Sequence, residues 1–482
     1  MGNLADDTRW MDATAQAGLV AEREVSATEL ADAAIERIEA LDGAINAVVM
    51  RWFERGRADA AAIDAGEAST DRPFAGVPFL LKDLATHLTG TPLSNGNVAL
   101  RDGQPISAHT TTLVERFVDA GLVTLGRTNS PELGSVPVTE PIAYGPTRNP
   151  FDTGRTPGGS SGGAAAAVAA GMVPIAHATD GGGSIRIPAS CCGIVGLKPS
   201  QGRITSGPDR DESGLSVGLC VSRTVRDTAR LLDAVHGPGI GDSVIAPPPA
   251  RSYAAEVGAD PGRLRIGMLD HHPQGIPVDD DCARAVVDTA TWLETLGHTV
   301  EPAYPAVLGD PDVGRQFMTL WATNAAIGIS GMGDMLERPL SEHEVEPVNW
   351  AMAQFASGAS SVDHATALVA VMRFRRTLRR WWSDGWDLLL TPTLAQPPLP
   401  VGSLDPTPDD PLAGMRVAST FSAFTPPYNL SGQPAISVPM HRTTAGLPIG
   451  VQLVADYGRE DVLIRVAAQL EAAHPWAEHR PS

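Results

Sequence analysis

Residues 154–200 have the densest glycine and serine content of the chain and restrict its fold more than any other stretch. GGSSGG at 158–163 leads directly into AAAAVAAG, a run that favours helix, and MVPIAHATD then has the pattern of a strand. A second glycine loop, GGGS, follows at 181–184. Because glycine has no Cβ, such a loop can turn its backbone N–H groups toward one point. The segment therefore predicts a helix after one glycine loop and a strand before another.

Short apolar runs nearer the amino terminus predict an α/β fold. GVPFLLKD from Gly76 and GLVTLGRTN from Gly121 have the length and composition of buried strands. TTLVERFVDAG, between them, has helical spacing. Strand–helix–strand alternation of this kind is typical of a mixed or parallel sheet covered by helices.

Other segments add helices and strands to this framework. Ser26 and Glu29 form a capping-box pattern for a helix expected to stop at Gly43, and the first 50 residues predict two helices. LRIGMLD, WDLLLTPT and AISVPM in the second half predict further strands. The chain is thus divided into N-terminal helices at 1–70, a core at about 71–240 and a helical insertion at about 310–380.

The charge balance argues against two classes of partner. A formal net charge of -20 repels nucleic-acid backbones and anionic membranes. The apolar runs are also much shorter than the ~20 residues of a membrane span. The opening residues MGNLADDTRW lack the basic and apolar regions of a secretory signal, and the cysteines have no CxxC spacing for zinc. We therefore expect a cytoplasmic protein with no nucleic-acid, membrane or metal partner.

Ser184 is the first candidate for chemistry. It follows Gly181, Gly182 and Gly183 at the end of a predicted strand. A serine placed there can attack a carbonyl while neighbouring N–H groups receive the developing negative charge. A tight turn or an anion-binding loop is the simpler explanation of the same residues, because glycine-rich turns are common.

Lys82, at the end of the apolar run VPFLL, is the second candidate. A buried ammonium is costly, and burial lowers the pKa of lysine toward that of a general base. Pairing with the adjacent Asp83 is the simpler alternative.

The loop GGSSGG matches two better-known motifs only in part. Gly158, Ser160 and Gly162 fit the GxSxG pattern of a nucleophile elbow, but NPFDTGRTP before them cannot form the strand that this elbow requires. A phosphate-binding loop would need a following GK[ST], which is absent from the sequence there. Neither motif accounts for the segment.

Taken together, these segments resemble the amidase signature family. The resemblance covers GRTPGGSSGGAAAAVAAGMVPIAHATDGGGSIRIPASCCGIVGLKPS over its whole length, and extends to GVPFLLKD, SGQPAISVP and GLPIGVQLV. It implies a single domain over 1–482 with an α/β fold, in which helices cover both faces of a mixed sheet. It also implies an amide hydrolase that needs neither metal nor organic cofactor.

The resemblance assigns roles residue by residue. Ser184 corresponds to the nucleophile, Ser160 to a bridging serine after a cis peptide bond, and Lys82 to the base. The N–H groups of Gly181, Gly182, Gly183 and Ser184 correspond to the oxyanion hole, although many relatives have Ile or Thr in place of Gly181. Supporting roles, chiefly structural hydrogen bonds, fall to Ser161, Asp180 and Arg186.

Segments outside the signature are similar to those of bacterial hydrolases that open nylon-type cyclic dimers. They include TEPIAYGPTRNP, which contains Tyr144, and EPAYPAVLGD. A cysteine in the helical insertion of those enzymes corresponds to Trp321 here. We therefore expect Tyr144 and Trp321 in the substrate pocket, and an indole there favours aryl or hydrophobic amides. Carbamates (urethanes), whose carbonyl has the same shape, and nylon oligomers extend this list of small-molecule substrates.

Three other functions share some of these residues. The glutaminase subunit of a tRNA-dependent amidotransferase has the same catalytic residues but requires partner subunits. An inactive binding protein could retain the fold, and a Ser-His-Asp hydrolase would have to use His177. The oligomeric state expected from the family is a monomer or a homodimer.

Overall fold

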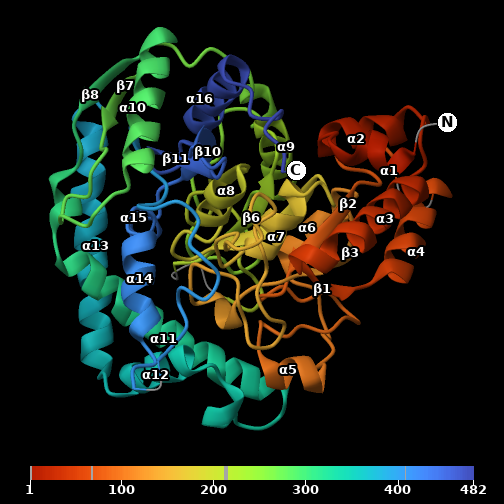
Figure 1. The fold of residues 1–482 in the computed structure, drawn as a ribbon, viewed down its shortest axis with the longest axis horizontal. Helices are drawn as coiled ribbons and strands as arrows, with labels where there is room; N and C mark the ends of the chain where they lie inside the picture. Colours follow the sequence, from red (N-terminus) through yellow and green to blue (C-terminus); the bar gives the residue numbers. More distant parts are fainter. Residues whose placement is uncertain (1–2, 67–68, 211–214, 408, 482) are drawn as a thin grey trace.

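Two β-sheets organise the chain in the computed structural model, which describes residues 3–66, 69–210, 215–407 and 409–481 (Figure 1). Within these residues the larger sheet has eight strands in the order β4-β6-β5-β10-β11-β9-β7-β8. Neighbouring strands are antiparallel from β4 to β9, and β9, β7 and β8 are parallel, so the sheet is mixed as expected. The strands are β4 (Ile175–Asp180), β5 (Val195–Lys198), β6 (Val217–Ser222), β7 (Arg265–Met268), β8 (Thr299–Pro302), β9 (Leu388–Pro392), β10 (Ala435–Arg442) and β11 (Pro448–Ala455).

The strand that carries Lys82 belongs to a second, smaller sheet. β2 (Pro78–Lys82) pairs in parallel with β3 (Val123–Thr128), and β1 (Val48–Arg51) pairs with β3 in the antiparallel direction. The strands expected after Gly76 and Gly121 are therefore present, with α6 (Thr112–Asp119) between them. β1 was not expected, because the segment 1–70 has a mainly helical pattern. β2 lies beside β4 of the large sheet, where the Lys82 N–H donates to His177 Nδ1 at 3.4 Å.

Helices cover both faces of the large sheet, as successive side chains of β9 show. Leu388 and Leu390 lie in one hydrophobic core with Val286 of α10 (Asp280–Thr295), whereas Leu389 lies in another with Leu378 of α13 (Ser361–Ser383). Because neighbouring side chains on a strand point to opposite faces, α10 and α13 lie on opposite sides of the sheet. The other helices here are α9 (Val225–Val235), α14 (Ala413–Phe421), α15 (Pro426–Ser431) and α16 (Glu460–Ala473).

The N-terminal helices depart from the expected boundaries. Ser26 and Glu29 form the predicted capping box of α3 (Ala27–Ile45), but the helix continues past Gly43. It ends at Asn46, which has a left-handed φ of 58° and donates a side-chain hydrogen bond to the Tyr144 carbonyl. The buried Ile45 explains the extension, because it continues the apolar face of the helix. Three helices rather than two lie in the first 50 residues, and another follows β1: α1 (Leu4–Arg9), α2 (Ala13–Ala21), α3 and α4 (Phe53–Asp64).

The glycine-rich segment forms the packed centre of the molecule. α7 (Gly162–Ala169) consists of glycine, alanine and one valine, and all of its residues are buried. Such small side chains allow close approach of neighbouring backbones; a Cβ on Gly163 would lie 2.5 Å from the Asn129 backbone nitrogen. After α7 the chain continues through β4 and the second glycine loop into α8 (Arg186–Cys192).

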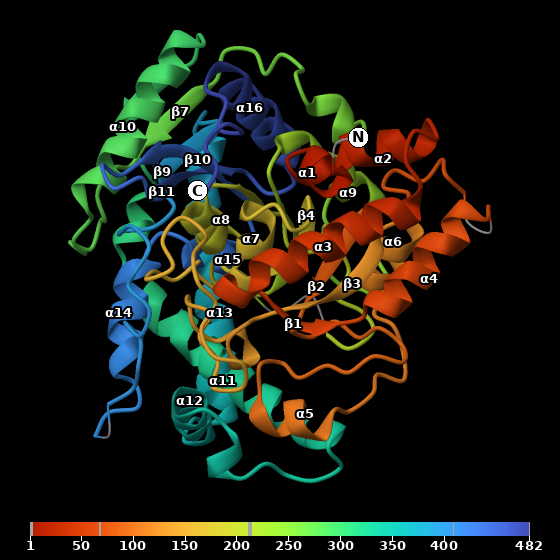
Figure 2. The ribbon, with the colours of Figure 1, turned by 45° about the vertical axis from the view of Figure 1, so that its right-hand side comes forward.

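Three helices occupy the segment expected to be a helical insertion. These are α11 (Asp312–Met335), α12 (Pro347–Ser357) and α13. In Figures 1 and 2, α11 and α12 lie with α5 (Val98–Gly103) at the end of the molecule opposite α10 and α16. None of the helices in the described ranges combines the length and apolar character needed to cross a bilayer.

Candidate active site

Lys82 ends a fully buried strand and meets three hydroxyl groups. Its Nζ lies 2.7 Å from Ser160 Oγ, 3.0 Å from Ser161 Oγ and 2.9 Å from Thr179 Oγ1. The neighbouring carboxylate of Asp83 is engaged elsewhere, because successive strand residues point to opposite sides; it accepts from the Ser94 N–H at 2.9 Å. Pairing of Lys82 with Asp83, the simpler alternative, is therefore wrong.

The surroundings of Lys82 favour its neutral amine. Burial lowers the pKa of Lys82 well below its ordinary value. The Asp180 carboxylate opposes this shift, and the positive charge of Arg210 adds to it. A neutral amine in contact with a serine hydroxyl can accept a proton from it.

Ser160 lies in the first glycine loop, directly before α7. The peptide bond between Gly159 and Ser160 is cis, as the family resemblance implies. Its neighbour Ser161 joins the loop to β4 through Thr179: the Ser161 hydroxyl is 3.2 Å from the Thr179 carbonyl and 3.2 Å from the Thr179 N–H. Ser161 thus makes the structural hydrogen bonds expected of it, in addition to its contact with Lys82.

The second glycine loop is folded around the carboxylate of Asp180. This carboxylate accepts from the Gly183 N–H at 2.7 Å and from the Ile185 N–H at 3.2 Å. Arg186 pairs with both of its oxygens at 2.9 Å, and all of these side chains are buried. Burial by itself would raise the pKa of Asp180, but the Arg186 guanidinium outweighs it and lowers this pKa to about 2. The ion pair holds the loop on the side of Asp180, and Ser184 lies on the opposite side of the loop.

This arrangement changes the expected set of oxyanion donors. The Gly183 N–H is already donated to Asp180, so it does not face the cavity as the family pattern suggests. In the part of the chain that the structure describes, the N–H groups of Gly181, Gly182 and Ser184 have no protein acceptor. These three remain available to a ligand.

Each glycine of the loop lies close to a neighbouring side chain. A Cβ on Gly181 would lie 3.0 Å from the Trp321 ring, and one on Gly182 would lie 3.0 Å from the Phe317 ring. Gly183 has a φ of +131°, and a Cβ there would lie 2.2 Å from Thr425 Oγ1. The absence of a side chain at Gly181 therefore makes room for Trp321.

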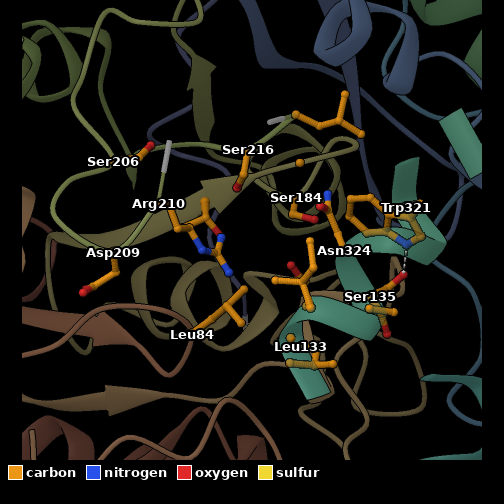
Figure 3. A pocket seen from close by; sticks show the side chains of 18 residues that line it. Leu84, Leu133, Ser135, Ser184, Ser206, Asp209, Arg210, Ser216, Trp321 and Asn324 are labelled. Carbon is orange, nitrogen blue, oxygen red and sulfur yellow. Dashed lines mark hydrogen bonds between the residues drawn. The ribbon is translucent and has the colours of Figure 1, made fainter. Parts of the chain in front are cut away.

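Two cavities meet at Ser184, and Figure 3 shows the first of them. The first, about 300 Å³, has Ser160, Thr179 and several other polar side chains in its wall, and we call it the polar cavity. The second, about 470 Å³, is the apolar cavity. Ser184 and Trp321 line both of them. The other polar side chains of the first are Ser206, Asp209, Arg210, Ser216 and Asn324; the second is walled mainly by Ile187, Leu308, Phe317, Met318, Met415 and Leu430.

Of the two residues expected in the substrate pocket, only one lines these cavities. Trp321 stacks on Phe317 with ring centroids 5.1 Å apart, and its Nε1 donates to the Ser135 carbonyl at 3.0 Å. Tyr144 is not among the described residues that line either cavity; its hydroxyl is 3.1 Å from Ser94 Oγ. The prediction for Tyr144 rested on the similarity of its segment to one in hydrolases of nylon-type cyclic dimers. In the structure the backbone of this segment, and not the Tyr144 side chain, is held against the core, because the Tyr144 carbonyl accepts a hydrogen bond from the Asn46 side chain.

Sequence analysis missed most of the polar cavity. Ser206, Asp209 and Arg210 come from the loop after β5, and Asn324 comes from α11. No spacing pattern connects these segments, and only the fold brings them to Ser184. The polar residues on one face of α11 were the sequence feature that could have indicated Asn324.

Two other buried titratable groups do not share this site. His177 is fully buried beside the Lys82 backbone, and burial lowers its pKa to about 3. It is not among the described residues around either cavity, so a Ser-His-Asp arrangement is not present. Lys198, which with Lys82 makes up all the lysines of the sequence, is also buried, and its Nζ donates to the Pro199 carbonyl at 2.9 Å.

The fold and this site define an enzyme class that comparison with known proteins confirms. The sequence matches the family described as Amidase over residues 29–464. The chain therefore belongs to the amidase signature family and is an amide hydrolase, as the signature segment predicts.

Similar proteins include enzymes that act on cyclic amides and aryl amides. The chain is 42% identical to a 6-aminohexanoate-cyclic-dimer hydrolase of Paenarthrobacter ureafaciens, over 98% of this chain and 96% of that protein. A solved structure of 6-aminohexanoate cyclic dimer hydrolase superposes with a TM-score of 0.94 at 42% identity, covering 98% of this chain and 99% of the other. A bacterial aryl acylamidase superposes with a TM-score of 0.87 at 28% identity, covering 98% and 97%.

Proposed function

We propose that this amidase hydrolyses hydrophobic and aryl amides through an acyl-enzyme, with Ser184 as nucleophile, Ser160 as proton relay and Lys82 as base. The observation that carries the proposal is the 2.7 Å contact between Lys82 Nζ and Ser160 Oγ, in a cavity that Ser184 also lines. A buried lysine is costly, because an apolar side chain would fill the same space without desolvating an amine, so its place beside a hydroxyl that lines the cavity supports a role in proton transfer.

The proposed reaction has two stages. The Ser184 hydroxyl attacks the amide carbon while its proton passes to Ser160, whose own proton passes to Lys82. The carbon–nitrogen bond then breaks, the proton returns through Ser160 to the leaving nitrogen, and the amine departs. Water attacks the resulting ester by the same relay, releasing the carboxylic acid and restoring Ser184.

The negative charge that develops on the carbonyl oxygen must be stabilised by hydrogen-bond donors of the second glycine loop. We assign this role to the N–H groups of Gly181, Gly182 and Ser184, because Gly183 already donates to Asp180. Each well-placed donor of this kind contributes about 3 kcal/mol to transition-state stabilisation.

Substrate class follows from the cavity walls. The apolar cavity, lined by Phe317, Met318 and Met415 among others, suits an acyl chain or a ring. Aryl carbamates present the same planar carbonyl and make the same demand on the oxyanion donors, so we include them. Cyclic and linear aminohexanoate oligomers are included because of the similarity to 6-aminohexanoate-cyclic-dimer hydrolase.

The test is a substrate panel with purified wild type and Ser184→Ala. The panel contains an anilide, an N-phenylcarbamate, a linear aminohexanoate oligomer and glutamine, with amine or ammonia release as the readout. We expect wild type to release aniline and Ser184→Ala to lose about a thousandfold or more of this activity. Ser252→Ala, at an exposed serine, is the matched control and should behave as wild type.

Each unexpected result rejects a different part of the proposal. Activity that survives in Ser184→Ala would reject the nucleophile. Release of aniline from neither the anilide nor the carbamate would reject the aryl substrates. Glutamine as the sole good substrate, with partner subunits that co-purify, would instead indicate an amidotransferase subunit.

A further inference from the structure

Arg210 brings an unpaired positive charge into the polar cavity. Its backbone N–H donates to Ser206 at 3.3 Å, but within the described ranges its guanidinium has no hydrogen-bond or ion-pair partner. The adjacent carboxylate of Asp209 acts on Arg210 only through its charge and makes no ion pair with it among the described residues; Asp209 Oδ2 lies 2.9 Å from His109 Nε2 instead. In Figure 3 the Arg210 side chain extends toward the centre of the cavity, whereas Asp209 points away from it.

The proposed relay decides which part of a substrate meets this charge. Ser160 and Thr179, both in contact with Lys82, line the polar cavity and are not among the described residues around the apolar one. Since Ser160 must return a proton to the leaving nitrogen, that nitrogen has to face the polar cavity. The amine part of the substrate then occupies the polar cavity, and the acyl part is directed past Ser184 into the apolar cavity.

We propose that Arg210 binds a carboxylate on the amine part of the substrate, so that N-acyl amino acids with an apolar acyl group are the preferred class. A guanidinium binds carboxylates through paired, charge-assisted hydrogen bonds, and the Arg210 guanidinium is open to such a ligand because the Asp209 carboxylate is bound to His109 instead. Ser206, Ser216 and Asn324 lie around Arg210 in the same cavity and can donate to the remaining carboxylate lone pairs.

This inference rests on the proposed amide hydrolysis, and a matched pair of substrates separates the two. The probes are N-hexanoyl-4-aminobenzoate and N-hexanoyl-4-aminobenzamide, which differ in the charge of the amine part and share the acyl chain. The quantity of interest is the ratio of their kcat/KM values. Differences in leaving-group reactivity cancel when this ratio is compared between wild type and a variant, as do effects of a variant on Lys82.

We expect the carboxylate-to-carboxamide ratio to fall about tenfold to a hundredfold in Arg210→Gln, the usual cost of losing a charge-assisted contact. Arg210→Lys, which keeps the charge but not the paired donors, should retain an intermediate ratio. Arg263→Gln, at an exposed arginine that donates to Thr299 on β8, is the remote control and should keep the wild-type ratio.

A third probe tests the orientation. The mono-anilide of adipic acid carries its carboxylate on the acyl part, and its preference over the corresponding terminal amide should not depend on Arg210. A ratio unchanged in Arg210→Gln overturns the carboxylate site, and an Arg210-dependent preference for the adipic mono-anilide overturns the orientation. If wild type hydrolyses none of the probes or the anilide panel, the proposed function itself fails.

Discussion

At the scale of single residues, the two lysines show how position decides chemistry. Lys82 and Lys198 each end a strand and are each buried. Lys198 Nζ donates to a backbone carbonyl, and burial lowers its pKa to about 7. Lys82 alone contacts the hydroxyls of Ser160, Ser161 and Thr179. A lowered pKa is therefore common to both lysines, and contact with hydroxyl groups that line the polar cavity distinguishes Lys82.

The base role predicts a specific pH dependence. Since burial lowers the pKa of Lys82, its neutral form dominates from a lower pH than for an ordinary lysine. We expect kcat/KM to fall as the pH drops through this depressed pKa and to be maintained above it. Lys82→Met should lose about a thousandfold of activity, whereas Lys198→Met, a matched buried lysine, should lose far less. A rise in kcat/KM only near the ordinary lysine pKa would contradict this role.

The contact between Gly181 and Trp321 predicts a coupled pair. Gly181→Ala places a Cβ 3.0 Å from the indole, which is fixed by its hydrogen bond to Ser135, so the ring must move and kcat/KM should fall several-fold. Trp321→Ala removes the obstacle. In a double-mutant cycle on unfolding free energy, we expect a coupling of about 0.5–2 kcal/mol. Additive effects would show that the loop accepts a larger residue without moving Trp321.

The sequence pointed to residues that the fold brings together where a motif is continuous along the chain. Ser160 and Ser184 fall in a single segment, and Lys82 has an unmistakable apolar context. The donation of the Gly183 N–H to Asp180 could not be predicted, because a glycine loop can turn each N–H either way. No sequence pattern indicated Arg210, because its place in the polar cavity depends on how the loop after β5 folds back over that cavity.

At the scale of elements, one carboxylate joins the helical insertion to the core. Glu132 lies just before Gly134 and Ser135, which line the polar cavity. Its Oε2 accepts from Asn97 at 2.7 Å, and its Oε1 accepts from Asn349 of α12 at 2.7 Å. Burial raises the pKa of Glu132, so keeping its carboxylate ionised at this position costs free energy.

Removal of this carboxylate should loosen the insertion. Glu132→Ala removes one acceptor each from the buried amides of Asn97 and Asn349, which keep only backbone carbonyls as acceptors, and it takes the acceptor of the Glu346 N–H away. We therefore expect a loss of about 1–3 kcal/mol in unfolding free energy. Amide hydrogen exchange in α12 should increase along with it. Glu342→Ala, an exposed glutamate of the same insertion, should change stability by no more than about 0.5 kcal/mol. Unchanged exchange in α12 would show that the insertion is held by its apolar contacts alone.

Helices and strands with a strong local sequence pattern were predicted well, but the elements that pair or pack with them were not. The helices of the insertion and the strands after Gly76 and Gly121 lie where the patterns place them. β1 was missed because four residues with a mixed burial pattern carry no period. The helix expected to stop at Gly43 continued to Ile45, since burial of an apolar side chain outweighed the glycine signal.

At the scale of the whole molecule, the fold class was predictable and the division into two sheets was not. Alternating strand and helix patterns indicate a mixed or parallel sheet, but they do not show that β2 and β3 pair apart from β4. This separation matters for the site: Lys82 arrives from one sheet, whereas Ser184 follows a strand of the other. The polar cavity therefore lies where the two sheets meet.

Because both lysines are buried, the folded protein offers no lysine amine to reagents in solution. Succinimidyl dyes, glutaraldehyde and isocyanates, which attack such amines, should leave Lys82 intact while the fold persists. A process that must bind the enzyme to a solid support cannot rely on lysine coupling. Carbodiimide coupling through carboxylates is the suitable route, because the chain has 56 acidic residues against 36 lysines and arginines.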